Sequence, residues 1–193
     1  FKAYGLENLA MSTRIMSRQK CSNIVTQAFE YAKKHHYKTV TVVDKPNVLR
    51  ETGGLMIRTA REVAKKYPDI ELWETNIDAQ AMWLIKNPHD YGVMVAENMF
   101  GDILSDLAAQ LVGGLGFASS GNIGDNYAVF EPTHGSAPKY TGQFKVNPMA
   151  MFLTTKLMLD WLDQKEMAEK LESAIAEVIK EGKVKTYDMG GSN

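Results

Sequence analysis

The chain has 193 residues, of which 45 % are hydrophobic, and its 22 Lys and Arg residues balance 23 Asp and Glu residues, for a net charge of −1. No basic excess indicates a nucleic-acid partner, and no apolar run is long enough to span a membrane. The single Cys21 excludes an intrachain disulfide and favours a reducing compartment, so we expect a cytoplasmic protein. This length predicts one large domain or two small ones with a substantial core.

Strand-like and helix-like segments alternate along the chain. β-branched and apolar runs predict strands, and amphipathic runs with helical spacing predict helices. The expected strands are residues 39–43, 70–74, 91–96 and 128–130, with a further candidate at 12–17. The expected helices are residues 24–34, 51–66, 79–86, 97–110, 147–162 and 164–180, and Asp78 is the expected cap of the third. This alternation predicts an α/β fold with a largely parallel sheet.

Two aspartates stand out in the predicted helix at 97–110. Asp102 and Asp106 are four residues apart, so their carboxylates project from one face about one turn apart. Like charges at this spacing destabilise a bare helix by roughly a few tenths of a kcal/mol, whereas a hard cation between them would reverse the effect. A solvated pair on an exposed face is the alternative. A neighbouring apolar stripe is expected to be buried, formed by Met99, Ile103, Leu107 and Leu111.

In an α/β fold, functional groups gather beyond the carboxyl ends of the strands. Asp44-Lys45-Pro46-Asn47 follows the strand predicted at 39–43, and Asp78 follows the one at 70–74. A lysine held at a strand end can have its pKa lowered by burial, as proton transfer requires. A surface lysine at a turn is the alternative reading of Lys45.

Residues 113–142 hold seven of the fifteen glycines and are predicted to be rich in loops. Within them, Gly135 lets the backbone approach a ligand, while Pro132 and Pro138 stiffen the segment Glu131–Tyr140. Backbone amides in such a loop can bind phosphate oxygens. The alternative interpretation of His134 is a purely structural role in the loop. No Walker-type loop and no Gly-x-Gly-x-x-Gly followed by a helix is present.

Several specific motifs occur in a fixed order: Asp-Lys-Pro-Asn-Val-Leu, Asn-Met-Phe-Gly-Asp-Ile-Leu-Ser-Asp, Gly-Asn-Ile-Gly-Asp, Glu-Pro-Thr-His-Gly-Ser-Ala-Pro-Lys-Tyr and Val-Asn-Pro. With these motifs the chain resembles the isocitrate and isopropylmalate dehydrogenase family of β-decarboxylating dehydrogenases, from about Ala10 to Gly191. The resemblance implies an isopropylmalate dehydrogenase-like two-domain α/β fold with largely parallel sheets. Residues 1–112 would belong to the smaller, dimer-forming domain and residues 113–193 to the cofactor-binding domain.

The resemblance also implies a reaction, in which NAD or NADP oxidises a small 2-hydroxy acid and metal-assisted loss of the β-carboxylate follows. The family's catalytic lysine falls on Lys45 and a substrate contact falls on Asn47. Its three ligands for Mg²⁺ or Mn²⁺ fall on Asp78, Asp102 and Asp106. In this family Lys45, Asn47 and Asp78 serve the active site of the neighbouring subunit, so a homodimer is implied.

The implied cofactor-binding residues are Glu131, Thr133, His134, Gly135, Ser136, Ala137, Lys139, Tyr140, Asn147 and Tyr187. His134 would lie near the adenosine and Asn147 at the adenine. Lys139, Tyr140 and Tyr187 match contacts to the 2′-phosphate in members selective for NADP, but Gly191 stands where those members usually place an arginine. We therefore expect NADP use with weakened discrimination, and NAD as a close second.

The same resemblance leaves the substrate and the role of the chain open. Isocitrate is favoured by Gly-Asn-Ile-Gly-Asp and Thr-His-Gly-Ser-Ala-Pro-Lys-Tyr, and isopropylmalate, homoisocitrate and tartrate are the alternatives. The substrate arginines and catalytic tyrosine of complete members are not visible, so the chain resembles the carboxyl-terminal part of an enzyme and is expected to be inactive alone. A non-catalytic regulatory subunit is a lesser alternative, because such subunits tend to lose the lysine or metal positions that are retained here.

Overall fold

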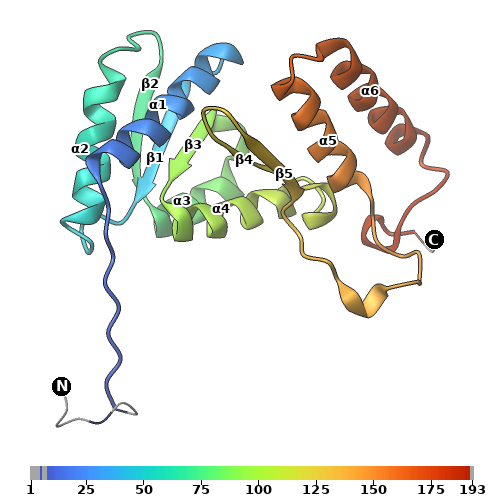
Figure 1. The fold of residues 1–193 in the computed structure, drawn as a ribbon, viewed down its shortest axis with the longest axis horizontal. Helices are drawn as coiled ribbons and strands as arrows, with labels where there is room; N and C mark the ends of the chain where they lie inside the picture. Colours follow the sequence, from blue (N-terminus) through green and yellow to red (C-terminus); the bar gives the residue numbers. More distant parts are fainter. Residues whose placement is uncertain (1–4, 6–7, 192–193) are drawn as a thin grey trace. The chain divides into compact units, whose positions relative to one another are not determined.

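The computed structural model describes residue 5 and residues 8–191, and the chain forms two compact units, residues 1–104 and 105–193. The first unit contains α1 (Arg18–Lys34), β1 (Thr39–Asp44), α2 (Thr52–Ala64), β2 (Glu71–Asn76), α3 (Ile77–Lys86), the short helix η1 (Pro88–Asp90) and β3 (Val93–Ala96). α4 (Asn98–Leu111) runs across the division. The second unit continues with η2 (Leu115–Phe117), β4 (Ser119–Ile123), β5 (Ala128–Pro132), η3 (Pro138–Tyr140), α5 (Met149–Trp161), α6 (Lys165–Glu181) and η4 (Tyr187–Met189). Figure 1 shows this alternation, which confirms the predicted α/β class.

The first unit is built on a parallel three-stranded sheet with the order β2-β1-β3. β1 is central because its continuous run of β-branched residues, Thr-Val-Thr-Val-Val, suits burial on both faces. The chain moves from β1 out to β2 and then back across β1 to β3, so right-handed connections place α2 and α3 on opposite faces. The carboxyl ends of β1 and β2 meet at one edge, where Asp44 lies opposite Asn76 in the register.

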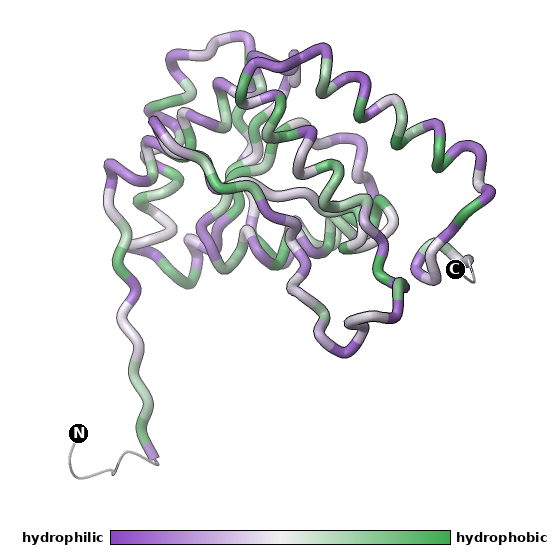
Figure 2. The backbone as a smooth tube through the Cα atoms, turned by 45° about the vertical axis from the view of Figure 1, so that its right-hand side comes forward, coloured by the Kyte–Doolittle hydropathy of each residue, from purple (hydrophilic) through white to green (hydrophobic). Residues whose placement is uncertain are grey.

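The apolar core of the first unit lies between the sheet and the helix pair α1 and α2, which run side by side in Figure 1. Phe29 of α1, Met56 of α2, and Val40 and Val42 of β1 are at most 1 % exposed. Figure 2 shows hydrophilic and hydrophobic stretches alternating along the helices, as expected where one face of each helix is buried. This packing gives the carboxyl edge of the sheet a rigid support.

The second unit contains an antiparallel hairpin of β4 and β5, with α5 packed on the hairpin and α6 packed on α5. β5 matches the strand expected at 128–130, but β4, Ser-Ser-Gly-Asn-Ile, was not predicted. Its residues have little strand propensity, and pairing with β5 imposes the extended conformation. Gly121 suits this position because a Cβ there would lie 3.1 Å from the ring of Phe130.

Two predictions about local structure were wrong. Residues 12–17 form no strand, and no described strand of the sheet pairs with them. The hydroxyl of Ser17 instead caps α1 by accepting a hydrogen bond from the backbone N–H of Lys20 at 3.3 Å, and α1 therefore begins earlier than expected. Asp78 does not cap α3, because the helix begins at Ile77 and Asn76 occupies the cap position.

The apolar stripe predicted on α4 is also largely exposed. Met99, Ile103 and Leu111 are 53 %, 52 % and 42 % exposed, whereas Phe100 and Leu104 are buried. α4 carries two overlapping apolar stripes, and helical periodicity alone cannot tell which one faces the protein. Among the described residues, no helix is long and apolar enough to cross a membrane.

Candidate active site

Lys45 and Asp78 meet at the carboxyl edge of the parallel sheet. Lys45 directly follows β1, Asp78 lies in the first turn of α3 just after β2, and the Lys45 Nζ atom is 2.5 Å from Asp78 Oδ1. This hydrogen bond, with those from the backbone N–H groups of Asp78 and Ala79, lowers the pKa of Asp78. Neighbouring strand ends therefore bring together two residues that are 33 positions apart in the sequence (78 − 45).

Asp44, which was not singled out as a functional residue, lies completely buried beside this pair. Its Oδ1 atom accepts a hydrogen bond from the backbone N–H of Lys45 at 2.6 Å, while its Oδ2 atom is buried without a partner. Gly53 of α2 contacts the carboxylate so closely that a side chain there would clash with it. Burial raises the pKa of Asp44, and the hydrogen bond from Lys45 and the charge of Arg14 only partly oppose this. The signal in the sequence that could have identified Asp44 is its position as a polar residue at the end of a buried strand.

Asn47 is exposed in the turn that follows Lys45. The backbone N–H groups of Val48 and Leu49 both donate to the carbonyl of Lys45, at 3.0 and 2.8 Å. This turn leaves the amide of Asn47 accessible to a ligand at the same edge of the sheet.

Asp102 and Asp106 are exposed on α4, one helical turn apart as predicted. Their carboxylate oxygens are the hard donors that Mg²⁺ and Mn²⁺ prefer, so the donor set fits such an ion. Within the part of the chain that the structure describes, no three His, Cys, Asp or Glu side chains converge as a metal site.

Glu97 and Arg14 also were not predicted to matter. Glu97 is the single residue between β3 and α4, and it forms an ion pair with Arg14. Burial of Glu97 raises its pKa, but hydrogen bonds from Arg14 and from the backbone N–H groups of Phe100 and Met99 outweigh it, and the pKa is lowered. The position of Glu97 at a strand–helix junction was visible in the sequence. Its partner was not, because the two residues lie 83 positions apart (97 − 14).

The predicted cofactor loop begins on β5, which contains Glu131, and continues through η3 to Tyr140. The N–H of Thr133 donates to the carbonyl of Ala118 at 3.1 Å, and His134 Nδ1 lies 2.9 Å from the carbonyl oxygen of Gly135. A Cβ on Gly135 would meet nothing within 4 Å, so this stretch of backbone, with the exposed Ser136, is accessible. Ala137 adopts a left-handed conformation (φ 45°), which is uncommon for a residue with a side chain.

Lys139, Tyr140 and Tyr187 come together in the second unit. The Lys139 Nζ atom lies 4.8 Å from the centre of the Tyr140 ring, and the rings of Tyr140 and Tyr187 are 6.0 Å apart. Hydrogen bonds from Lys139 and Tyr187 lower the pKa of Tyr140, and the bond with Tyr140 raises that of Tyr187. One ammonium and two phenol groups therefore form a cluster of hydrogen-bond donors suited to an anion.

Asn147 is only 4 % exposed, and both ends of its side-chain amide are engaged within the protein. Its Nδ2 group donates to Asp188 Oδ2 at 3.0 Å, and its Oδ1 atom accepts from the N–H of Met149 at 3.0 Å. Gly116 packs against both Asn147 and Asp188. The side chain therefore ties the start of α5 to η4, the segment that carries Tyr187.

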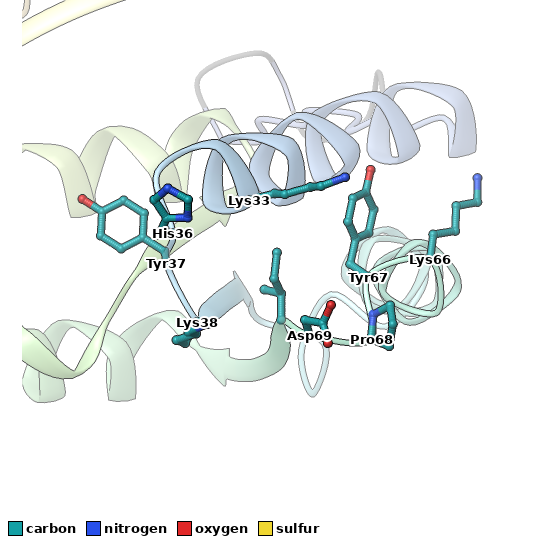
Figure 3. A pocket seen from close by; sticks show the side chains of 9 residues that line it. Lys33, His36, Tyr37, Lys38, Lys66, Tyr67, Pro68 and Asp69 are labelled. Atoms are coloured by element: carbon teal, nitrogen blue, oxygen red, sulfur yellow. The ribbon is translucent and has the colours of Figure 1, made fainter.

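A separate cavity of about 180 Å³ lies at the amino ends of β1 and β2, away from Lys45 and Asp78. Figure 3 shows Lys33 extending toward Tyr67 along this cavity, while Lys66 points outward. These lysines lie in or just after the last turns of α1 and α2, where cations stabilise the carboxyl ends of helices. None of the predicted site residues lines this cavity.

The lysine–aspartate pair lies at the carboxyl edge of the parallel sheet, where open α/β sheets commonly bind their ligands. Comparisons with known proteins define the class. The model of the isocitrate/isopropylmalate dehydrogenase family matches residues 2–193, and the chain belongs to this family. The resemblance inferred from the sequence motifs is thereby confirmed.

Two relatives and one solved structure illustrate the similarity. The chain is 46 % identical over 189 residues to the 3-isopropylmalate dehydrogenase of Archaeoglobus fulgidus, covering 98 % of this chain and 58 % of that protein. It is 45 % identical over 183 residues to the mitochondrial NAD isocitrate dehydrogenase catalytic subunit 5 of Arabidopsis thaliana, covering 94 % and 49 %. The crystal structure of isocitrate dehydrogenase from Methylococcus capsulatus superimposes with a TM-score of 0.90 at 41 % identity, covering 93 % and 53 %. The chain thus spans about half the length of the relatives that it matches, and the predicted fold is confirmed.

Proposed function

We propose that the protein containing this chain catalyses the metal-dependent oxidative decarboxylation of a 2-hydroxy acid with NAD or NADP as hydride acceptor. The observation that carries this proposal is the contact between Lys45 and Asp78 at adjoining strand ends, in a chain of the isocitrate/isopropylmalate dehydrogenase family. Isocitrate is the favoured substrate, and 3-isopropylmalate, homoisocitrate and tartrate are the alternatives. Relatives named for isocitrate and for 3-isopropylmalate are almost equally similar to the chain, so substrate choice has to be measured.

Lys45 is proposed to move the proton. Its side chain is 23 % exposed, and its ammonium group is held by Asp78 at the sheet edge, where it can exchange a proton with the hydroxyl or enolate oxygen of a bound substrate. The buried carboxylate of Asp44 holds the backbone at Lys45 and so restricts where the side chain begins. Asn47, exposed in the adjoining turn, is proposed to donate a hydrogen bond to the substrate.

Asp78, Asp102 and Asp106 are proposed to hold Mg²⁺ or Mn²⁺, with Asp78 contributed by the second subunit of a homodimer. The cation would stabilise the negative charge that develops on the substrate as carbon dioxide leaves. Large apolar side chains on α3 and α4 support a homodimer, because Met82, Ile85, Met99 and Ile103 are each more than half exposed. A second copy of the chain would bury them.

The nucleotide is proposed to bind along Glu131–Tyr140 with Lys139, Tyr140 and Tyr187 facing the adenosine ribose. The cluster of Lys139 with the two tyrosines supports a contact with a 2′-phosphate and hence NADP. The Arabidopsis relative, in contrast, is named for NAD, which supports NAD. Comparing turnover with both nucleotides in the wild type and in Lys139→Asp tests this choice, and a wild type that strongly prefers NAD, with no change in the variant, would exclude Lys139 as a phosphate ligand.

The central experiment assays the full-length protein with Mn²⁺, each of the four acids and each nucleotide, following formation of the reduced nucleotide. Lys45→Met should lower kcat by roughly 10²–10⁴-fold, as expected for loss of a proton-transfer group. Lys38→Met is the matched control, because Lys38 is exposed and lies at the other end of β1. Full activity in Lys45→Met would refute its role, and no turnover with any acid would refute the proposed reaction. A dimer that binds Mn²⁺ and isocitrate without turnover would instead indicate a regulatory subunit.

A further inference from the structure

The start of α4 is held by an unusual cap. Glu97 accepts hydrogen bonds from the backbone N–H groups of Met99 at 3.2 Å and Phe100 at 3.1 Å, and its own carbonyl accepts one from Gly101 at 2.7 Å. Ser, Thr, Asp and Asn are the usual residues at such a position, because their short side chains reach these N–H groups most easily. The longer side chain of Glu97 also reaches a second partner.

That partner is Arg14, which lies in the irregular segment before α1. The Arg14 guanidinium forms an ion pair with the Glu97 carboxylate, and its central carbon lies 5.3 Å from the centre of the Phe100 ring. The Arg14 and Glu97 side chains are only 28 % and 13 % exposed. Phe100, the third residue of α4, is itself only 7 % exposed. Arg14 therefore contacts both the capping residue and the first turn of α4.

These contacts all fall on the first turn of α4 and bear on how the helix is rotated about its axis. Successive helical residues differ by about 100° in direction, so a small rotation of the first turn moves every later side chain sideways. Asp102 follows Phe100 by two residues, and Asp106 lies one turn further along the same helix. The contacts made by Arg14 and Glu97 thus bear directly on where both carboxylates point.

We infer that Arg14 and Glu97 are positioning residues for the metal-binding carboxylates of α4. The inference rests on the proposed function, because it assumes that Asp102 and Asp106 bind Mg²⁺ or Mn²⁺. Residues that orient metal ligands commonly change metal affinity by roughly 10–100-fold when they are replaced, without touching the ion. If the Arg14–Glu97 ion pair only stabilised the fold, its loss would lower the free energy of unfolding and leave the Mn²⁺ affinity of the folded protein unchanged.

The test measures Mn²⁺ affinity in the full-length protein from the electron paramagnetic resonance signal of free Mn²⁺, which does not depend on turnover. Arg14→Gln should weaken Mn²⁺ binding by about tenfold, and Arg14→Lys should restore most of the affinity because it keeps the charge. Arg18→Gln is the matched control. It breaks the exposed ion pair between Arg18 and Glu62, which joins α1 to α2, and it should leave the affinity unchanged.

Glu97→Asp separates the two roles of the glutamate. Aspartate is a preferred helix cap, so α4 should still form, but its shorter side chain cannot also reach Arg14. Weaker Mn²⁺ binding by this folded variant supports the inference. Unchanged affinity in both Arg14→Gln and Glu97→Asp overturns it and leaves the proposed function intact. If the wild type shows no Mn²⁺ binding that Asp102→Asn weakens, the proposed metal site is itself wrong and the inference falls with it.

Discussion

The two units of the chain differ in how they bury their aromatic and aliphatic residues. In the first unit, Phe29 is completely buried among valines and a methionine, whereas Phe144 in the second unit is 96 % exposed. Buried side chains of the second unit are mostly small or polar, and among its described residues they are Ala109, Asn147, Ala150, Thr154, Ala168 and Ile175. Dense packing fixes side chains in position, while sparse packing permits local opening. Lys45, the proposed proton-transfer residue, therefore lies in the more densely packed unit, and the proposed nucleotide loop, Glu131–Tyr140, lies in the less densely packed one.

The backbone reinforces this contrast. Of the four described non-glycine residues with positive φ, three lie in the second unit, namely Ala137, Phe144 and Asp163. Each costs about 1 kcal/mol or more relative to an ordinary conformation. Asp163 follows the C-cap of α5, where a left-handed residue commonly ends a helix, whereas Ala137 lies in the proposed nucleotide loop, where such strain is typical of ligand sites.

Phe29→Ala should have the largest effect on stability, lowering the free energy of unfolding by about 3–5 kcal/mol. Phe29 is fully buried and stacks on Tyr67 at 4.9 Å between ring centres. Urea unfolding followed by tryptophan fluorescence measures the change. Phe152→Ala, at a residue of α5 that is 43 % exposed, is the control in the second unit and should cost less than about 1 kcal/mol. Equal losses would remove the contrast between the units.

Asp44→Asn should change how stability depends on pH. Because burial raises the pKa of Asp44 above its ordinary 3.8, ionisation is disfavoured in the folded state, and wild-type stability falls as pH rises from that value through the folded pKa. Asparagine can still accept the hydrogen bond from Lys45 but cannot ionise. Across that pH range, the free energy of unfolding of the variant should rise relative to that of the wild type by about 1.4 kcal/mol for each unit by which the pKa of Asp44 is raised. If the free energies of unfolding of the two proteins change in parallel with pH, ionisation of the buried Asp44 does not destabilise the folded state.

Tyr67→Phe should lower stability by about 1 kcal/mol near neutral pH, since the Tyr67 hydroxyl donates to Glu30 Oε1 at 2.6 Å on a partly exposed surface. The hydrogen bond to Glu30, with smaller contributions from burial and the Glu30 charge, raises the pKa of Tyr67 to about 12. The stabilisation from this hydrogen bond is therefore complete at pH values below the ordinary tyrosine pKa of 10.0 and is lost as the pH rises through about 12. Chemical denaturation across this range compares the two proteins. A difference that does not shrink in alkali would refute the role of this hydrogen bond.

Phe144→Gly should have the smallest effect and the opposite sign, raising the stability of the second unit by about 0.5 kcal/mol. Its φ of 52° suits glycine, and the greater freedom of glycine in the unfolded chain offsets part of the gain. Phe144→Ala is the control, because alanine keeps the conformational cost and should give no gain. Thermal unfolding followed by near-ultraviolet circular dichroism measures both. A destabilised glycine variant would indicate that the exposed ring contributes to packing.

The sequence by itself determined those features that depend on neighbouring residues in the chain. The β-branched run of β1, the amphipathic pattern of α6 and the order of strands and helices are local, so the α/β class was predictable. The spacing of Asp102 and Asp106 and the place of Lys45 after a strand follow from the same local patterns. The family motifs are short contiguous segments, which is why family membership could also be inferred from the chain alone.

Only the tertiary structure decided which residues meet. Strand β4 exists because β5 pairs with it, and α4 buries Phe100 and Leu104 rather than the predicted stripe because its orientation depends on what surrounds it. The contacts of Lys45 with Asp78 and of Arg14 with Glu97 join residues far apart in the sequence. Such contacts form when packed elements bring distant charges together, and no periodicity within a single element encodes them.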